Sequence, residues 1–475
     1  HAIRLEKSGA LMPNKVSPLK DWIGKRLHFV GIGGAGMSGL ARIALSHGIT
    51  VTGSDAKDST VLSALQALGA EVHAAHSGEQ VDGADFVIFS TAISASNVEL
   101  IRARELNLPI LTRAQALATL MSDSRSVAVA GTHGKTTTSS MLTVALQACG
   151  LDPSFAIGGT LTSSGSNAHR GTGDLFIAEA DESDGSFIEY HPYSAIVTNV
   201  EHDHVDFFAT IADVTRAFSE FAGSISRDGF LVYCADDSGS ALLASTVSDI
   251  KTISYGKKEG SELFIDSVNL LPMGSTSRVI WRGRTIGTMS LQVPGLHNVL
   301  NAGAALAMAL ALGAPAAEAL NGLASFHGTG RRFELKATVH GIRVIDDYGH
   351  HPTEIDVTLT AAKRYAGDGR VLVIFQPHRY SRTQAFMNEF ARALAIADEV
   401  VLLEIYAASE APISGITSET IAAQMEHGRF IPNFLEASDW VIDNAKPGDV
   451  IITLGAGDVN SLAPIIGDGL ARRFN

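Results

Sequence analysis

The chain has 475 residues, of which 45% are hydrophobic, so it is long enough for two to four domains with filled cores. Its formal net charge is -14, from 36 basic and 50 acidic residues. This balance argues against nucleic-acid binding, and any anionic ligand must be held by local groups.

Strand-like runs alternate with helical stretches along most of the sequence, which predicts parallel α/β architecture. We expect residues 1–19 to be a disordered or tag-derived tail, followed by a Rossmann-like domain over 20–122. A second α/β domain is expected over 123–335, with a small antiparallel insertion between 250 and 295. A third, also Rossmann-like, is expected over 336–475.

Cysteine content and hydropathy bear on the compartment. The two cysteines, Cys149 and Cys234, are too few for a disulfide framework, and no signal-peptide pattern opens the chain, so we expect a bacterial cytoplasmic location. The most apolar stretch, 301–320, contains glycine and proline and predicts a buried helix rather than a membrane span.

The first glycine-rich loop lies in "HFVGIGGAGMSG", residues 28–39. Gly31, Gly33 and Gly36 form G-x-G-x-x-G after a predicted strand, and Asp55 follows at the distance of a ribose-binding acid. From these residues alone, a nicotinamide dinucleotide is the default ligand.

A second loop, in "VAVAGTHGKTTTSS", has the features of a phosphate-binding loop for ATP. Gly131 and Gly134 let the backbone wrap phosphate oxygens, Lys135 reaches the β and γ phosphates, and the Thr136 hydroxyl is a magnesium ligand. The loop is a variant, because Val129 stands where the strict pattern has glycine.

Acidic residues follow the next predicted strand, in "FIAEADESDGSF". Alternation along the strand places Glu179 and Asp181 on one side, and their carboxylates suit Mg²⁺ or Mn²⁺ shared with phosphate. A solvated acidic loop is the alternative. In "TNVEHDHVDFF", His202 and His204 have a spacing also found at zinc sites, but a supporting role at a magnesium site or a structural role is favoured.

Two arginines, Arg379 and Arg382, follow the apolar strand "VLVIF" within "HRYSR". A guanidinium fork suits the α-carboxylate of an amino acid, and Arg382 is the preferred choice for that bond. The alternative is a solvated helix face. The segment "IDDYGHHP" also ends a predicted strand, at the edge where α/β sheets bind ligands.

Taken together, "GTHGKTTT", "EADESD", "TNVEHDH", "GLHNVLNAGAALA", "GTGRRFE", "DDYGHHPTE" and "FQPHRYSRT" occur in the order found in the Mur ligases. With "GIGGAGMSGLA" they resemble those members that join L-alanine to UDP-N-acetylmuramate, over residues 26 to 461. One departure is Ser409 in "YAASEAP", where the family pattern has glycine.

The resemblance implies a role for individual residues. The first domain would bind the sugar nucleotide through its glycine loop and later strand ends: Gly31, Gly33, Gly34, Ala35, Gly36, Met37, Ser38, Asp55, Ser90, Thr91, Ala92 and Arg113. ATP would be bound by Gly131, Thr132, His133, Gly134, Lys135, Thr136, Thr137, Asn298, Asn301, Arg332 and Asp347. Thr136 and Glu179 would bind a first magnesium ion and His204 a second, and the amino acid would meet Tyr348, His350, Arg379 and Arg382.

The implied reaction is phosphorylation of the lactyl carboxylate by ATP, followed by attack of the L-alanine amine on the acyl phosphate. Lys135, Glu179, His204 and His350 would be the catalytic groups, with His350 a candidate proton acceptor. The implied partners are UDP-N-acetylmuramate, L-alanine and ATP, in a monomer or weak homodimer without membrane insertion.

Three other functions are possible from the sequence. A related ligase would add a whole peptide to UDP-muramate during wall recycling. A nicotinamide-dependent oxidoreductase would leave Lys135 and the arginine pair unexplained. A regulator with a phosphate-binding loop would bind nucleotide without ligating anything.

Overall fold

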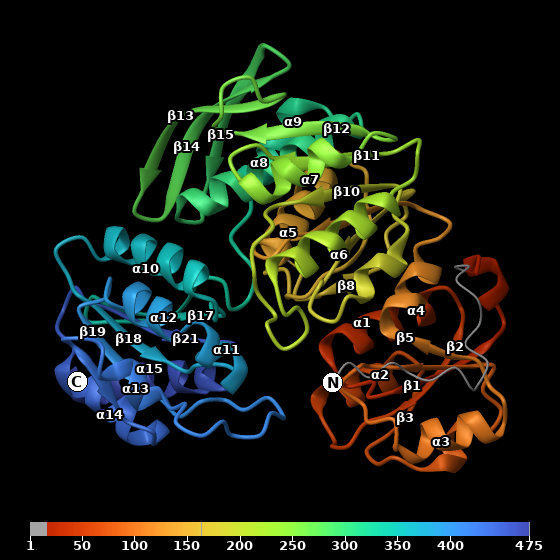
Figure 1. Cartoon of the computed structure of the whole chain (residues 1–475), viewed down its shortest axis with the longest axis horizontal. Coiled ribbons are helices and arrows are strands. Elements are labelled where there is room, and N and C mark those ends of the chain that lie inside the picture. The colour runs from red at the N-terminus through yellow and green to blue at the C-terminus, as the bar shows by residue number, and fades with distance from the viewer. Residues whose placement is uncertain (1–16, 163, 475) are drawn as a thin grey trace.

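The computed structural model describes residues 17–162 and 164–474. Within these ranges the chain forms three sheets, one after another along the sequence, each covered by helices (Figure 1). The predicted three-domain α/β class is therefore confirmed. Of the tail expected at 1–19, residues 1–16 lie outside the described residues, and Leu19 is already buried at the start of a 3-10 helix.

The N-terminal sheet is parallel, with the strand order β3-β2-β1-β4-β5. Gly31, directly after β1, has φ +81°, and its N–H donates to the Ser54 carbonyl at 2.8 Å, which turns the chain toward α1. The elements of this unit are η1 (Leu19–Trp22), β1 (Arg26–Val30), α1 (Ala35–Ser46), β2 (Thr50–Ser54), α2 (Thr60–Ala67), β3 (Glu71–His73), η2 (Gly78–Val81), β4 (Phe86–Phe89), α3 (Val98–Glu105), β5 (Ile110–Thr112) and α4 (Arg113–Leu120).

The central sheet has the order β15-β14-β13-β12-β11-β10-β6-β9-β7-β8. Its elements are β6 (Arg125–Ala130), α5 (Lys135–Ala148), β7 (Ser154–Ala156), β8 (Ala168–His169), β9 (Leu175–Glu179), η3 (Ser186–Tyr190), β10 (Ser194–Val197), α6 (Ile211–Gly223), β11 (Phe230–Cys234), α7 (Ser238–Thr246), β12 (Lys251–Gly256), β13 (Leu263–Leu271), β14 (Gly274–Trp281), β15 (Arg284–Leu291), α8 (Leu296–Ala311) and α9 (Ala316–Ala324).

Two features of this sheet matter for the site. Strand β6 lies between β9 and β10 and is parallel to both, so the segments that follow these three strands meet at one edge. The antiparallel strands β13, β14 and β15 extend the same sheet beyond β12 and project from the molecule (Figure 1).

The apolar stretch 301–320 is not one buried helix, so that prediction is wrong in its extent. Helix α8 ends at Ala311 and α9 begins at Ala316. Gly313 between them has φ +93°, and Pro315 stands at the N-cap of α9, so the chain turns there. Among the described residues, no helix combines the length and apolarity needed to cross a bilayer.

The C-terminal sheet has the order β16-β17-β21-β18-β19-β20, parallel except for the β16–β17 pair. Its elements are β16 (Glu334–Val339), β17 (Ile342–Asp347), α10 (Pro352–Ala366), β18 (Val371–Phe375), α11 (Tyr380–Ala385), α12 (Met387–Leu394), β19 (Glu399–Leu402), α13 (Ser418–Ala422), β20 (Gly428–Phe430), α14 (Phe434–Asn444), β21 (Val450–Leu454), η4 (Val459–Ser461) and α15 (Leu462–Phe474).

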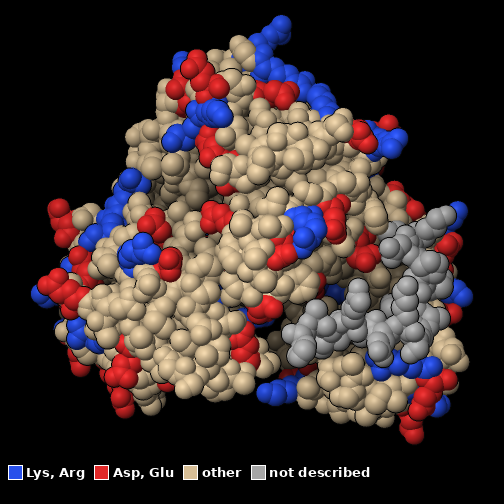
Figure 2. Space-filling model, viewed as in Figure 1, with Lys and Arg blue, Asp and Glu red and all other residues tan. Residues whose placement is uncertain are grey.

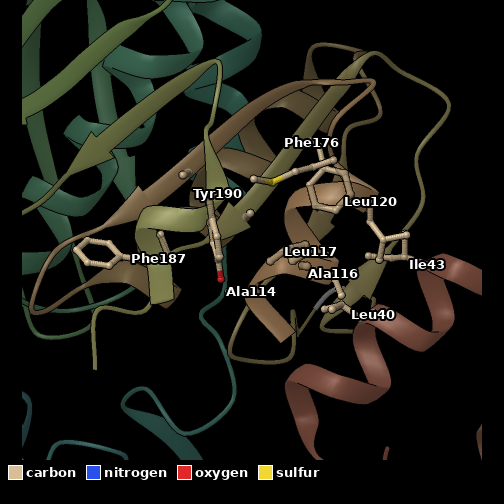
Figure 3. Packing of buried hydrophobic residues seen from close by; sticks show 14 of the residues in the cluster. Leu40, Ile43, Ala114, Ala116, Leu117, Leu120, Phe176, Phe187 and Tyr190 are labelled. Carbon is tan, nitrogen blue, oxygen red and sulfur yellow. The ribbon is translucent and has the colours of Figure 1, made fainter. Parts of the chain in front are cut away.

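The N-terminal and central units share a hydrophobic core. Leu40 from α1, Leu117 from α4, and Phe176 and Tyr190 from the central unit belong to one buried cluster (Figure 3). Asn167 also donates to the Ala35 carbonyl at 3.0 Å across the junction. This packing fixes the glycine loop of the first unit beside the central sheet.

Basic and acidic side chains are intermingled over the face of the molecule shown in Figure 2.

Candidate active site

The phosphate loop joins β6 to α5 and requires its glycines. Gly134 has φ +82°, and a Cβ there would lie 2.5 Å from Oδ1 of Asn301. Gly131 has φ +132°, and a Cβ would lie 2.0 Å from Oγ1 of Thr198. The loop therefore brings its backbone against α8 and the β10 loop, and it directs the N-terminus of α5 toward the cavity described below.

Lys135, the first residue of α5, is held by a carboxylate that the sequence analysis left unassigned. Its Nζ lies 2.8 Å from Oε2 of Glu182 and 2.8 Å from the Gly131 carbonyl. Burial lowers the pKa of Lys135, but Glu182 and Asp181 outweigh it and hold the pKa above its ordinary value. Lys135 is thus a fixed cation at the phosphate loop.

The acidic segment after β9 and the loop after β10 meet beside Lys135. Thr136 Oγ1 donates to Glu179 Oε1 at 3.1 Å, and Glu179 Oε2 accepts from the Gly158 amide at 2.7 Å. His204 Nε2 lies 3.3 Å from Glu182 Oε1. Asp181, Glu182 and His204 offer ligand atoms that all lie within 4.8 Å of one another.

These donors fit a hard divalent cation. They comprise carboxylates, a threonine hydroxyl and one imidazole, and Glu179 and Asp181 line the same cavity as Lys135. Burial lowers the pKa of His204, but Glu182 and Asp203 raise it above its ordinary value. Thr136 and Glu179 are hydrogen-bonded to each other, so a metal would take the place of that contact.

The C-terminal unit closes the cavity of about 600 Å³ above the phosphate loop. It contributes Tyr348 and His350 after β17, and Arg379 and Arg382 after β18, so the structure brings together all of the residues predicted for the amino acid. Ala35 of the glycine loop lines this cavity as well. All three units therefore border one space.

Both arginines are paired across the domain junction. Arg382 is 3% exposed, and its Nε and Nη2 each lie 3.0 Å from Oδ1 of Asp203. Arg379 is half-buried and pairs with Asp206. The alternative of a solvated helix face is therefore excluded, because both arginines form ion pairs within the protein.

His350 is a neutral imidazole at neutral pH. Its Nδ1 lies 3.3 Å from Oε2 of Glu354 and 3.1 Å from the Tyr348 carbonyl. Burial lowers its pKa to about 4, although Glu354 opposes the shift. An uncharged imidazole facing the cavity is able to accept a proton.

A second cavity, of about 150 Å³, lies between α8 and the C-terminal unit. Asn298, Asn301 and Arg332 line it, together with Asp347, which accepts from the Phe333 and Gly349 amides at 2.8 Å. Burial raises the pKa of Asp347. His133, Gly134 and Thr137 border this cavity from the phosphate loop, so it joins the two groups predicted for ATP.

A third cavity, of about 300 Å³, lies between the N-terminal and central units. Of the residues predicted for the sugar nucleotide, those lining it are Gly34, Ala35, Gly36, Met37, Ser90 and Arg113. Glu179 and Asp181 border it from the central unit, so this cavity adjoins the one that contains Lys135.

The other residues predicted for the sugar nucleotide do not line that cavity; they are Gly31, Gly33, Ser38, Asp55, Thr91 and Ala92. Asp55 instead accepts from the Gly33 amide at 2.9 Å, which braces the loop. Ser38 is buried, and its hydroxyl donates to the Ala35 carbonyl at 3.1 Å.

Three acids of the site had no individual role predicted from the sequence: Glu182 and Asp203, which were considered only as members of acidic segments near a magnesium site, and Glu354. Glu182 belongs to "EADESD", but β9 ends at Glu179, so strand alternation says nothing about position 182. Asp203 pairs with an arginine 179 residues away. Glu354 contacts His133 and His350, and the only local signal was its place three residues after the α10 N-cap His351.

The fold and site define an ATP-using ligase with three α/β units around a phosphate loop. The Mur ligase family catalytic-domain model matches residues 26–125, the Mur ligase middle-domain model matches 129–309, and the Mur ligase glutamate-ligase-domain model matches 331–457.

Curated relatives extend this match. A UDP-N-acetylmuramate--L-alanine ligase of Renibacterium salmoninarum is 49% identical over 94% of this chain and 96% of its own. One from Mycobacterium tuberculosis is 46% identical over 95% and 96%. The chain therefore belongs to the Mur ligase family, as its motifs indicated.

Solved structures agree. A UDP-N-acetylmuramate-alanine ligase from Thermotoga maritima has a TM-score of 0.78 at 30% identity, covering 94% of this chain and 98% of that one. A murein peptide ligase from Psychrobacter arcticus has a TM-score of 0.70 at 25% identity, covering 94% and 99%.

Proposed function

We propose that this protein joins L-alanine to the lactyl carboxylate of UDP-N-acetylmuramate with hydrolysis of ATP to ADP and phosphate, in peptidoglycan precursor synthesis. The relatives at 46% to 49% identity that bear the name of this activity support the proposal over nearly the whole chain.

One structural observation carries the proposal: the cavity around Lys135 is bordered by all three units and adjoins both the nucleotide cavity and the glycine-loop cavity. A ligase with three substrates needs such a common space, because the carboxylate that becomes the acyl donor, the phosphoryl donor and the amine must meet. The glycine loop receives the diphosphate of the sugar nucleotide, and the phosphate loop receives ATP.

Thr136 and Glu179 would hold one Mg²⁺ or Mn²⁺ ion, and His204 would hold a second, with Asp181 and Glu182 beside it. A bound divalent cation supplies charge neutralisation for the transferring phosphoryl group. Lys135, fixed by Glu182, lies where it offsets further negative charge on the phosphates.

The reaction proceeds through an acyl phosphate, because phosphorylation of the carboxylate makes phosphate, rather than oxide, the leaving group. The amine of L-alanine attacks the carbonyl carbon of the acyl phosphate and loses a proton, and phosphate leaves. His350, uncharged and oriented by Glu354 and the Tyr348 carbonyl, is the proton acceptor we propose. Arg379 and Arg382 bind the α-carboxylate of the amino acid.

A peptide-adding recycling ligase is the second candidate, because a murein peptide ligase shares the fold at 25% identity. The single-amino-acid activity is favoured since the named relatives at nearly twice that identity are L-alanine ligases. We further propose a cytoplasmic enzyme that acts as a monomer or weak homodimer.

The test is ADP release with UDP-N-acetylmuramate and each amino acid in turn. L-Alanine-dependent turnover is expected, with slower turnover for glycine or serine, because one methyl group discriminates by only about 1–3 kcal/mol. Turnover with the tripeptide L-Ala-γ-D-Glu-meso-diaminopimelate but not with L-alanine would select the recycling reaction. Turnover indifferent to the amino acid would exclude a ligase.

A further inference from the structure

The loop after β10 contacts two parts of the site through the neighbouring residues Asp203 and His204. His204 points to the Lys135 side, with its Nε2 3.3 Å from Glu182 Oε1. Asp203, the preceding residue, pairs with Arg382 of the C-terminal unit, and its Oδ2 also lies 3.8 Å from His204 Nε2. His204 has φ +51°, an unusual conformation for a residue with a side chain.

The Asp203 carboxylate is fixed by its own loop. Its Oδ1 accepts from the His204 amide at 2.6 Å as well as from Nε and Nη2 of Arg382. Both side chains of the pair are at most 4% exposed. Three N–H donors from two units therefore converge on one carboxylate oxygen that is removed from solvent.

This pairing dictates how Arg382 is presented. Because Nε and Nη2 both contact Asp203, the guanidinium plane cannot rotate without breaking a buried ion pair. The remaining nitrogen, Nη1, lies 3.4 Å from His378 Nδ1 on the side of the cavity. A ligand carboxylate therefore meets an Arg382 guanidinium group that is already oriented, rather than a mobile side chain.

We propose that Asp203 is a positioning residue for amino-acid binding: it holds Arg382 in the orientation that receives the α-carboxylate. This inference rests on the proposed function. The exposed pair between Asp174 and Arg125, 3.5 Å apart and with neither residue lining the cavity, lacks the burial needed for such an effect and serves as the control.

The test compares Asp203→Asn, Asp203→Glu and Asp174→Asn in steady-state kinetics with each substrate varied separately. Asp203→Asn raises the KM for L-alanine at least about tenfold. The KM values for ATP and UDP-N-acetylmuramate stay within about threefold of wild type, which a general loss of structure would not allow. Asp174→Asn changes all three KM values by less than about threefold.

Two further measurements keep the outcome decisive. In an Arg382→Lys background, Asp203→Asn adds little to the KM for L-alanine, since the two residues act as a unit. If Asp203→Asn does not fold, Asp203→Glu retains the charge but displaces the carboxylate by one methylene and raises the same KM.

An unchanged KM for L-alanine in a folded Asp203 variant would overturn the inference, as would equal rises for all three substrates. Failure of the proposed function itself has a different signature, because the wild-type enzyme would then show no L-alanine-dependent ADP release.

Discussion

Nζ of Lys135 lies 2.8 Å from Oε2 of Glu182, and both side chains are almost completely removed from solvent. The pair joins the phosphate loop after β6 to the acidic segment after β9. Nζ also donates to the Gly131 carbonyl at 2.8 Å, so the side chain is held against its own loop, and Glu182 provides the opposing charge that keeps it ionised.

Replacement of Lys135 separates the two anion-binding loops. Lys135→Ala is expected to lower the rate of ADP release at least about 10²-fold, because the fixed cation at the transferring phosphoryl group is lost. Binding of UDP-N-acetylmuramate, measured by calorimetry, should persist, since its cavity is lined from the glycine loop. Loss of both together would refute this division of labour.

Glu182 has a predicted effect on stability as well. Glu182→Gln leaves Lys135 buried without its counter-charge, and we expect the free energy of unfolding from urea denaturation to fall by about 3–5 kcal/mol. The double variant Lys135→Met with Glu182→Gln should recover part of that loss.

The control for this prediction is the exposed pair of Arg125 and Asp174, 3.5 Å apart. Asp174→Asn should cost at most about 1 kcal/mol. Equal effects at Glu182 and Asp174 would contradict the view that burial makes the Lys135 pair costly to break.

The motifs could be assigned to strand ends from the sequence, but the order of those strands in the sheet could not be predicted. "GTHGKT", "EADESD" and "TNVEHDH" each follow an apolar run, so each could be placed at the carboxyl end of a strand. That β6 lies between β9 and β10 is set by sheet topology, and it is this order that brings Lys135 to Glu182 and His204.

Contacts between the units could not be predicted from the sequence, for a physical reason. The pairing of Arg382 with Asp203 depends on how the C-terminal unit packs against the central one, and no local pattern encodes it. Asp55 was predicted to contact the sugar nucleotide because of its distance in sequence from the glycine loop, and in the structure its carboxylate accepts from the Gly33 amide of that loop.

The departure from the family pattern at Ser409 is a source of strain. Ser409 has φ +72°, in the left-handed region that glycine adopts without cost, and it is exposed. Ser409→Gly should therefore raise the stability by about 0.5–1 kcal/mol, seen as a higher Tm. Ser409→Ala keeps the Cβ and should bring no such gain, and an equal gain from both would show that backbone strain is not the cause.

The last prediction concerns pH and the contact between the phosphate loop and α10. His133 Nδ1 lies 3.3 Å from Glu354 Oε1, and its Nε2 lies 3.5 Å from Glu201 Oε2. The ring of His351 packs against it at 4.7 Å between centroids. Burial lowers the pKa of His133, but the two glutamates outweigh it and raise the pKa to about 9.

A pKa raised above the unfolded value means that the folded state binds the proton more tightly. The stabilisation from His133 is therefore fully present below about pH 6.5 and is lost as the pH rises through about 9, with an upper bound of about 3 kcal/mol. The pKa of His351 is lowered to about 4 by burial first and by His133 second, so its titration lies outside this window.

His133→Gln removes the charge while its backbone amide keeps the Asn199 side chain as acceptor. The variant should melt well below wild type at pH 6, and the difference in Tm should narrow as the pH approaches 10. Asp174→Asn, whose carboxylate is remote from this cluster, should show a difference from wild type that is the same at both pH values. A His133→Gln deficit that stayed constant from pH 6 to 10 would mean that His133 is uncharged in the folded protein, and that the loop is tied to Glu354 by a neutral hydrogen bond instead.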